Sequence, residues 1–185
     1  MNNSYYAQAI KQIAKGYIFI FLNINIGTLN IIPNWIGYIM FYRAIPSIAK
    51  YEKSAKLLNP LIIFIGSYEL LCWFFQIFNI NLDIYIIEVI ISALKLYLDF
   101  QLLTNIADIA ISHQYEDSQK IYTLRNIQVV LMTLIVLPIQ WEKFVFGTVV
   151  YILLCVVITI WICVVLFDYA RFEEKKSVID FISEE

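Results

Sequence analysis

Residues 59–79 read NPLIIFIGSYELLCWFFQIFN, and residues 84–104 read IYIIEVIISALKLYLDFQLLT. A helix of about 20 mainly apolar residues can cross the roughly 30 Å hydrocarbon core of a bilayer. Both stretches reach this length, and the short polar turn Asn81-Leu82-Asp83 lies between them. They therefore predict two transmembrane helices that form a tight antiparallel hairpin.

The same pattern occurs again towards the C-terminus. Residues 121–140 and 144–169 are long apolar stretches on either side of Trp141-Glu142-Lys143. Pro138 lies near the end of the first stretch, where a proline helps to stop a helix. We expect a second hairpin of two transmembrane helices here.

The N-terminal region is apolar but interrupted. Residues 16–42 contain several asparagines and Pro33, and one continuous helix would bury those amides beside lipid. Two shorter helices, about 5–22 and 33–50, joined by a polar turn, avoid this cost. A full crossing pair and a re-entrant hairpin both stay open for this region.

The basic residues favour six crossings with both termini in the cytoplasm. Cytoplasmic loops of membrane proteins carry an excess of lysine and arginine. Of the 13 basic residues, all except Lys143 and Lys95 then lie on the cytoplasmic side. A re-entrant first hairpin gives the same distribution, so the charges do not separate the two alternatives.

The composition agrees with a membrane protein, because 61% of the 185 residues are hydrophobic and 15% are charged. Soluble domains carry about 25% charged residues. A disordered chain, a disulfide scaffold or a nucleic-acid binder needs charge, cysteine or a basic face that this chain lacks. We expect an all-α fold: an integral membrane bundle of six transmembrane helices in three antiparallel hairpins over residues 1–170. The cytoplasmic tail, residues 171–185, is expected to form a short amphipathic helix.

Ionisable residues inside a membrane are costly and need a reason. Glu88, Ser92, Lys95 and Asp99 fall within about 60° of one another on a helix that turns 100° per residue. Such a stripe must face the bundle interior, a water-filled cavity or another protein.

The preceding stretch carries a matching face with Glu69 and Gln76. The hairpin turn places Glu69 opposite Lys95 and Gln76 opposite Glu88, so we predict an ion pair between Glu69 and Lys95. Together with Asp99, three carboxylates then surround one lysine, and in a low dielectric at least one of them tends to take up a proton. The stripe can hold the two helices in register, bind a small cation, proton or amine substrate, or dock a basic residue of a partner.

Known catalytic and metal-binding patterns are missing from the sequence. His113 is the only histidine, and we expect it in a solvated cytoplasmic loop beside Glu116 and Asp117. A zinc site there is not expected, because neither a cysteine nor a second histidine is near. The sequence contains no CxxC, GxSxG or HExxH motif. We expect no cofactor, no metal site and no enzymatic activity.

One motif carries a resemblance. Residues 27–38, GTLNIIPNWIGY, are followed by a basic loop, and this pattern is similar to a group of small polytopic inner-membrane proteins from low-GC bacteria. That group has no assigned activity. The resemblance covers about the first third of the chain and implies a multi-pass protein of a bacterial inner membrane, without assigning any functional residue.

The leading functional hypothesis is a small transporter, or the membrane-embedded substrate-binding subunit of one. Its partners are the lipid bilayer, a small cation, proton or amine substrate, and a protein partner or a second copy of the chain. The alternative is a non-transporting membrane partner: a sensor, a scaffold or a toxin-immunity protein. A third reading, an intramembrane enzyme, needs Glu88 or Asp99 in a cleft open to lipid. The residues expected to bind the ligand are Glu69, Gln76, Glu88, Lys95 and Asp99.

Overall fold

The computed structural model is almost entirely helical. It describes residues 2–21, 25–26, 29–30, 33–78, 80, 85–136 and 145–183. Within these ranges the α-helices are α1 (Asn2–Phe21), α2 (Asn34–Ile48), α3 (Leu58–Ile77), α4 (Tyr85–Ser112), α5 (Ser118–Val136) and α6 (Val145–Ser183). A short 3-10 helix, η1 (Lys53–Leu57), precedes α3, and two short strands, β1 (Asn25–Ile26) and β2 (Leu29–Asn30), pair antiparallel between α1 and α2.

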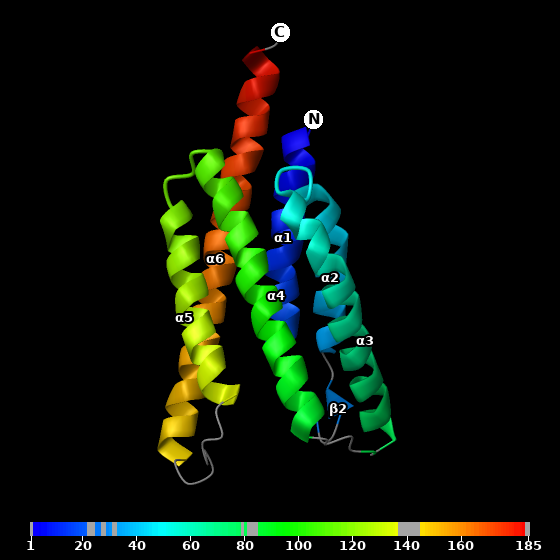
Figure 1. Cartoon of the computed structure of the whole chain (residues 1–185). Helices are drawn as coiled ribbons and strands as arrows, with labels where there is room; N and C mark the ends of the chain where they lie inside the picture. The colour runs from blue at the N-terminus through cyan, green and yellow to red at the C-terminus, as the bar shows by residue number, and fades with distance from the viewer. Residues whose placement is uncertain are drawn as a thin grey trace.

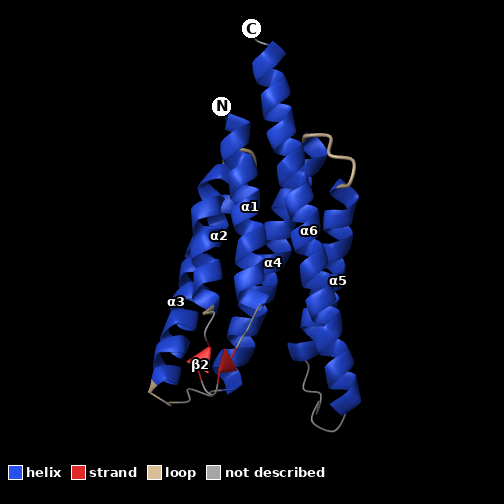
Figure 2. Cartoon of the chain, turned by 180° about the vertical axis from the view of Figure 1, so that it is seen from behind, coloured by secondary structure: helices blue, strands red, loops and turns tan. Residues whose placement is uncertain are grey.

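The helices run alternately up and down as one elongated bundle. Both termini, the turn between α2 and α3, and the turn between α4 and α5 lie at the same end (Figure 1). The two short strands lie at the opposite end, as the view from behind also shows (Figure 2). This order agrees with the predicted succession of antiparallel hairpins.

Helices α1 and α2 approach each other closely at two glycines. Gly16 and Gly37 face each other so closely that a Cβ atom on Gly37 would lie 2.6 Å from the carbonyl oxygen of Gly16. A Cβ atom on Gly16 would lie 2.6 Å from the ring of Phe41. Small residues allow helix backbones to approach in this way. Phe41 then packs edge-on against Tyr17, with ring centroids 5.1 Å apart, inside the main hydrophobic core.

Proline and capping residues set the helix boundaries near α2 and α3. Pro33 lies immediately before α2 in an extended conformation, and Pro60 lies in the first turn of α3, where no intrahelical N–H bond is lost. The side chain of Glu52 accepts a hydrogen bond from the backbone N–H of Ser54 at 3.1 Å and caps η1. This hydrogen bond lowers the pKa of the Glu52 carboxyl.

Two helical segments are long and apolar enough to cross a membrane: Lys53–Ile77, which joins η1 to α3, and Phe146–Val178 of α6. The core helix of a soluble protein is mostly buried, but only 17% of the most apolar window of the first segment and 39% of the second is buried. The outer surface of α6 exposes large apolar side chains at helical spacing. They include Phe146, Val149, Leu153, Val157, Ile160 and Val164.

Several observed boundaries differ from the expected ones. Helix α4 continues to Ser112 instead of ending near residue 104. The tail is not a separate short helix, because α6 continues without a break to Ser183 over 39 residues, or about 58 Å. Helix α2 has 15 residues and spans only about 22 Å. The predicted turns at 81–83 and 141–143, and Pro138, lie outside the described residues.

Candidate functional site

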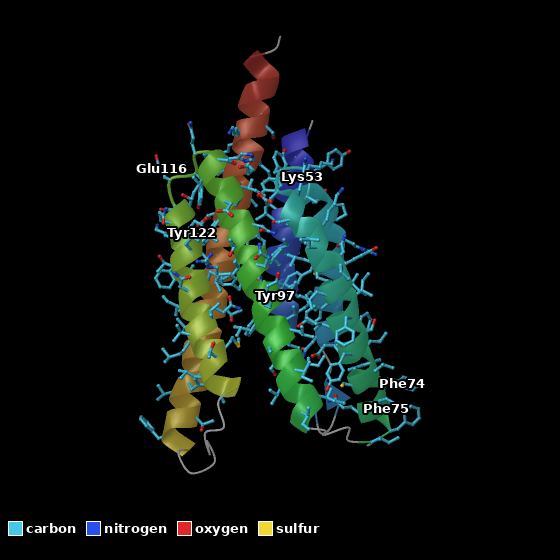
Figure 3. All side chains as sticks on the ribbon, in the orientation of Figure 1. Lys53, Phe74, Phe75, Tyr97, Glu116 and Tyr122 are labelled. Atoms are coloured by element: carbon cyan, nitrogen blue, oxygen red, sulfur yellow. The ribbon has the colours of Figure 1, made fainter. Side chains whose placement is uncertain are left out.

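A polar cavity of about 320 Å³ lies between α3 and α4, in the half of the bundle away from the termini. Its lining residue Phe75 lies near the C-terminal end of α3, and Lys53 lies at the other end of the bundle (Figure 3). The sequence-predicted residues Glu69, Gln76, Glu88 and Lys95 all line this cavity. The other lining residues are Tyr68, Cys72, Phe75, Ile80, Ile91 and Ser92.

Glu69 is the most buried charge of the cavity, and both of its carboxylate oxygens have partners. Oε1 forms an ion pair with Nζ of Lys95, and Oε2 accepts a hydrogen bond from Nδ2 of Asn34 at 3.2 Å. The predicted pairing of Glu69 with Lys95 is therefore confirmed. The Glu69 side chain is 13% exposed and that of Lys95 is 35% exposed, so the lysine still faces the cavity.

Glu88 is the unbalanced charge of the cavity. Its side chain is exposed on the first turn of α4 and forms no ion pair or hydrogen bond with another described residue. Since Glu69 and Lys95 form an ion pair, Glu88 is the one acidic side chain without a basic partner among the described residues that line the cavity. Gln76 and Ser92 add uncharged polar groups to the same wall.

Asp99 does not belong to this cavity, although the helical stripe predicted that it would. It lies one turn beyond Lys95 but accepts a hydrogen bond from Nε2 of Gln128 on α5, at 3.3 Å. Helix α4 tilts across the bundle, from α3 at its first turns towards α5 at its last turns (Figure 1). The same face of α4 therefore meets two different helices along its length.

Asn34 is the residue of the site that sequence reasoning missed. The sequence predicts Asn34 at the start of the helix expected over 33–50 and gives it no partner. The available signal was its position directly after Pro33, where α2 begins and where an amide can point along the helix towards a neighbour. Through Asn34, the GTLNIIPNWIGY segment contacts the predicted polar site.

A second polar cluster lies at the end of the bundle that carries the termini. The expectation of a solvated His113 is wrong: its Nδ1 lies 2.7 Å from Oε1 of Glu173, and its side chain is only 16% exposed. The rings of Tyr6 and Tyr51 pack edge-on against the imidazole, with centroids 5.7 Å and 5.1 Å away. The Glu173 side chain is fully buried.

This cluster connects the extension of α6 to the rest of the bundle. Lys176 donates from Nζ to the backbone carbonyl of His113 at 3.4 Å, and Lys11 of α1 pairs with Glu174 at 2.6 Å. Gln114 directly follows His113 with a φ of 62°, a left-handed conformation that ends α4. Burial raises the pKa of Tyr51, and the nearby Glu173 carboxylate raises it further.

Two further cavities among the described residues are apolar. One of about 320 Å³ lies between α1 and α6, where Phe21, Val156 and Phe167 are among its lining residues. Another, of about 220 Å³, lies between α2 and α3. Within the described part of the chain, no group of three His, Cys, Asp or Glu residues could hold a metal ion. The cavity between α3 and α4 is therefore the candidate site on chemical grounds.

The fold and the site together define a helical bundle with two membrane-length apolar segments and a charged cavity between α3 and α4. No family model, no curated protein and no solved structure matches this chain.

Proposed function

We propose that this protein is a small membrane transporter, or the membrane-embedded substrate-binding subunit of one, with the cavity between α3 and α4 as its substrate site. The observation that carries the proposal is the open volume beside the Glu69–Lys95 pair. A pair that served only to hold two helices in register would be enclosed by packed side chains. Ligand sites have volumes of about 300–1,000 Å³, and this cavity lies at the lower end of that range.

The proposal includes six membrane crossings, with both termini in the cytoplasm of a bacterial cell and the cavity facing the outer side. The exposed apolar surface of α6 and the low burial of α3 support immersion in lipid. The turns at the end that carries the termini are rich in lysine, with Lys50, Lys53 and Lys56 in one of them. The GTLNIIPNWIGY segment supports a place among the small polytopic inner-membrane proteins that it resembles.

A non-transporting membrane partner is the second candidate. The observation in its favour is the extension of α6, which projects past the other helices at the end of the bundle that carries the termini (Figure 1). Such a helix could dock a second protein without any use of the cavity. An enzyme is not proposed, because Asp99 bonds to Gln128 outside the cavity and no hydrogen bond joins Glu88 to a nucleophile among the described residues.

The three native cysteines provide a test without any change to the chain. Cys72 lines the polar cavity, whereas Cys163 is buried beside the apolar cavity between α6 and α1, with its thiol 3.5 Å from the carbonyl oxygen of Ala14. Thiols react with N-ethylmaleimide as thiolates in water. We expect Cys72 to be modified much faster than Cys163 when the labelled peptides are quantified by mass spectrometry.

Two matched variants locate the reactivity in the cavity. Ser92→Phe places a large side chain into the cavity, while Ala93→Phe adds the same group to the exposed side of the same helix. We expect Ser92→Phe to slow modification of Cys72 at least about tenfold and Ala93→Phe to leave it unchanged. If Cys72 reacts as slowly as Cys163 in the unmodified chain, the cavity is dry and closed, and the proposed function fails.

A further inference from the structure

We infer that the cavity between α3 and α4 selects a small organic cation with a single ammonium group, which Glu88 holds as the counter-charge. This inference rests on the proposed function and specifies the substrate class of the same site. It follows from three observations: the charge that remains in the cavity, the aromatic side chains in its wall and its volume.

The charge excludes anions and disfavours zwitterions. Lys95 is the only basic residue among the described residues that line the cavity, and Glu69 already neutralises it. Oε2 of Glu69 is occupied by Asn34, so the unpaired Glu88 carboxylate is the group left to receive a ligand charge. A carboxylate that has no ion-pair partner attracts a cation and repels an anion.

The lining chemistry favours an organic cation over a metal ion. A hard cation such as Ca²⁺ takes six to eight oxygen ligands, and Mg²⁺ requires octahedral geometry. Glu88 provides one free carboxylate, and no described cluster of three acidic, histidine or cysteine side chains surrounds it. Tyr68 and Phe75 also line the cavity, and aromatic faces attract organic ammonium groups by cation–π interaction.

The volume of the cavity favours a small molecule, and not a proton, as the ligand. A proton-binding carboxylate needs no open space around it, whereas this cavity has about 320 Å³. Gln76 and Ser92 offer uncharged polar groups to the remainder of a ligand. The site is therefore suited to an ammonium group at Glu88 and a small polar or apolar body along α3.

The native Cys72 thiol can report this selectivity. Two methanethiosulfonate reagents of similar size transfer either a trimethylammonium-ethylthio group or a sulfonato-ethylthio group to a thiolate, which forms a mixed disulfide and releases methanesulfinate. Their rates at Cys72, divided by their rates with a free thiol in solution, give the charge preference of the cavity. We expect the cationic reagent to be favoured about tenfold or more at Cys72.

A pair of charge-matched variants assigns the preference to Glu88. Glu88→Gln should lower the ratio to within about threefold of unity, whereas Asp108→Asn removes an exposed charge of α4 outside the cavity and should leave the ratio unchanged. Equal normalised rates of the two reagents at Cys72 in the native chain, or an anionic preference, would overturn the cation inference while leaving an open site. Failure of Cys72 to react with either reagent or with N-ethylmaleimide would overturn the proposed function as well. The reaction of Cys72 with N-ethylmaleimide and its charge preference are both measured on the unsubstituted chain.

Discussion

Asn34 at the start of α2 donates a hydrogen bond to the same Glu69 carboxylate that pairs with Lys95 of α4, with 3.2 Å between Nδ2 and Oε2. The Glu69 side chain of α3 thus contacts both α2 and α4. This arrangement occupies both carboxylate oxygens of Glu69. It also holds Lys95 at the edge of the cavity and leaves Glu88 as the unpaired charge.

The Glu69–Lys95 pair should be energetically coupled. Lys95→Met alone leaves a partly buried carboxylate without its cation, and Glu69→Gln alone leaves the ammonium group without its anion. Polar interactions between membrane helices contribute about 0.5–1.5 kcal/mol. We therefore expect the double variant to be more stable than the sum of the two single losses by about this amount.

Equilibrium unfolding in mixed micelles with increasing sodium dodecyl sulfate measures this coupling. It is carried out on the native chain, the two single variants and the double variant. Asn34→Leu, made alone and together with Glu69→Gln, measures the coupling between Asn34 and Glu69 in the same way. Strictly additive losses would mean that the three side chains do not act as one group.

The approach of α1 to α2 requires glycine at position 37. A Cβ atom there would lie 2.6 Å from the carbonyl oxygen of Gly16, and overpacking of this kind costs about 1–3 kcal/mol. Gly37→Ala should therefore destabilise the protein in the same unfolding assay. Gly147→Ala is the matched control, because Gly147 is exposed in α6 and alanine is the better helix former there. Equal effects of the two substitutions would contradict the close contact.

The extension of α6 should depend on its buried carboxylate. Glu173→Ala removes the fully buried partner of His113, and loss of a buried charge-assisted hydrogen bond costs about 1–3 kcal/mol. Glu174→Ala, one residue further, breaks a half-exposed pair with Lys11, which is worth about 0–1 kcal/mol.

Thermal unfolding combined with proteolysis of the C-terminal segment distinguishes these two variants. We expect Glu173→Ala to lower the midpoint temperature of thermal unfolding more than Glu174→Ala does. It should also accelerate proteolytic cleavage after Lys175 and Lys176. If Glu174→Ala has the larger effect, the His113–Glu173 pair does not anchor the helix.

The proposed membrane orientation predicts three labelling results. Ser4 lies in the first turn of α1 and Gln114 lies just beyond the end of α4, and these two helix ends lie at the end of the bundle that carries the termini (Figure 1). Ile80 lies just beyond the C-terminal end of α3, which lies at the opposite end of the bundle. In intact cells an impermeant maleimide should label Ile80→Cys, and it should label Ser4→Cys and Gln114→Cys after the membrane is permeabilised. Labelling of Ser4→Cys in intact cells would contradict the proposed orientation.

The sequence predicted the helical succession and the Glu69–Lys95 contact because both depend on local rules. Apolar length predicted the helices, and the turn expected from the sequence at 81–83 predicted which residues of the hairpin lie at equal depth. Asp99 could not be placed in this way, since its neighbour depends on the tilt of α4 from α3 towards α5. Helical periodicity gives the direction of a side chain but not which helix lies opposite.

The polar cluster around His113 was missed for a similar reason. His113 and Glu173 are 60 residues apart, and nothing in the charged tail distinguishes the buried Glu173 from the half-exposed Glu174. The long α6 brings Glu173 beside the end of α4, so the contact depends on the continuation of one helix beyond residue 169. Because the sequence predicts that the last helix ends at residue 169, with the apolar stretch, it does not predict a contact between Glu173 and His113.

Native mass spectrometry of the protein, gently extracted from its own membrane at natural expression, tests the central claim most directly. We predict a monomer or homo-oligomer that carries a reproducible small-molecule adduct, retained in Ala93→Phe and lost in Ser92→Phe. A stoichiometric complex with a second polypeptide, with no adduct and no effect of Ser92→Phe, would contradict a substrate site between α3 and α4 and favour the non-transporting partner.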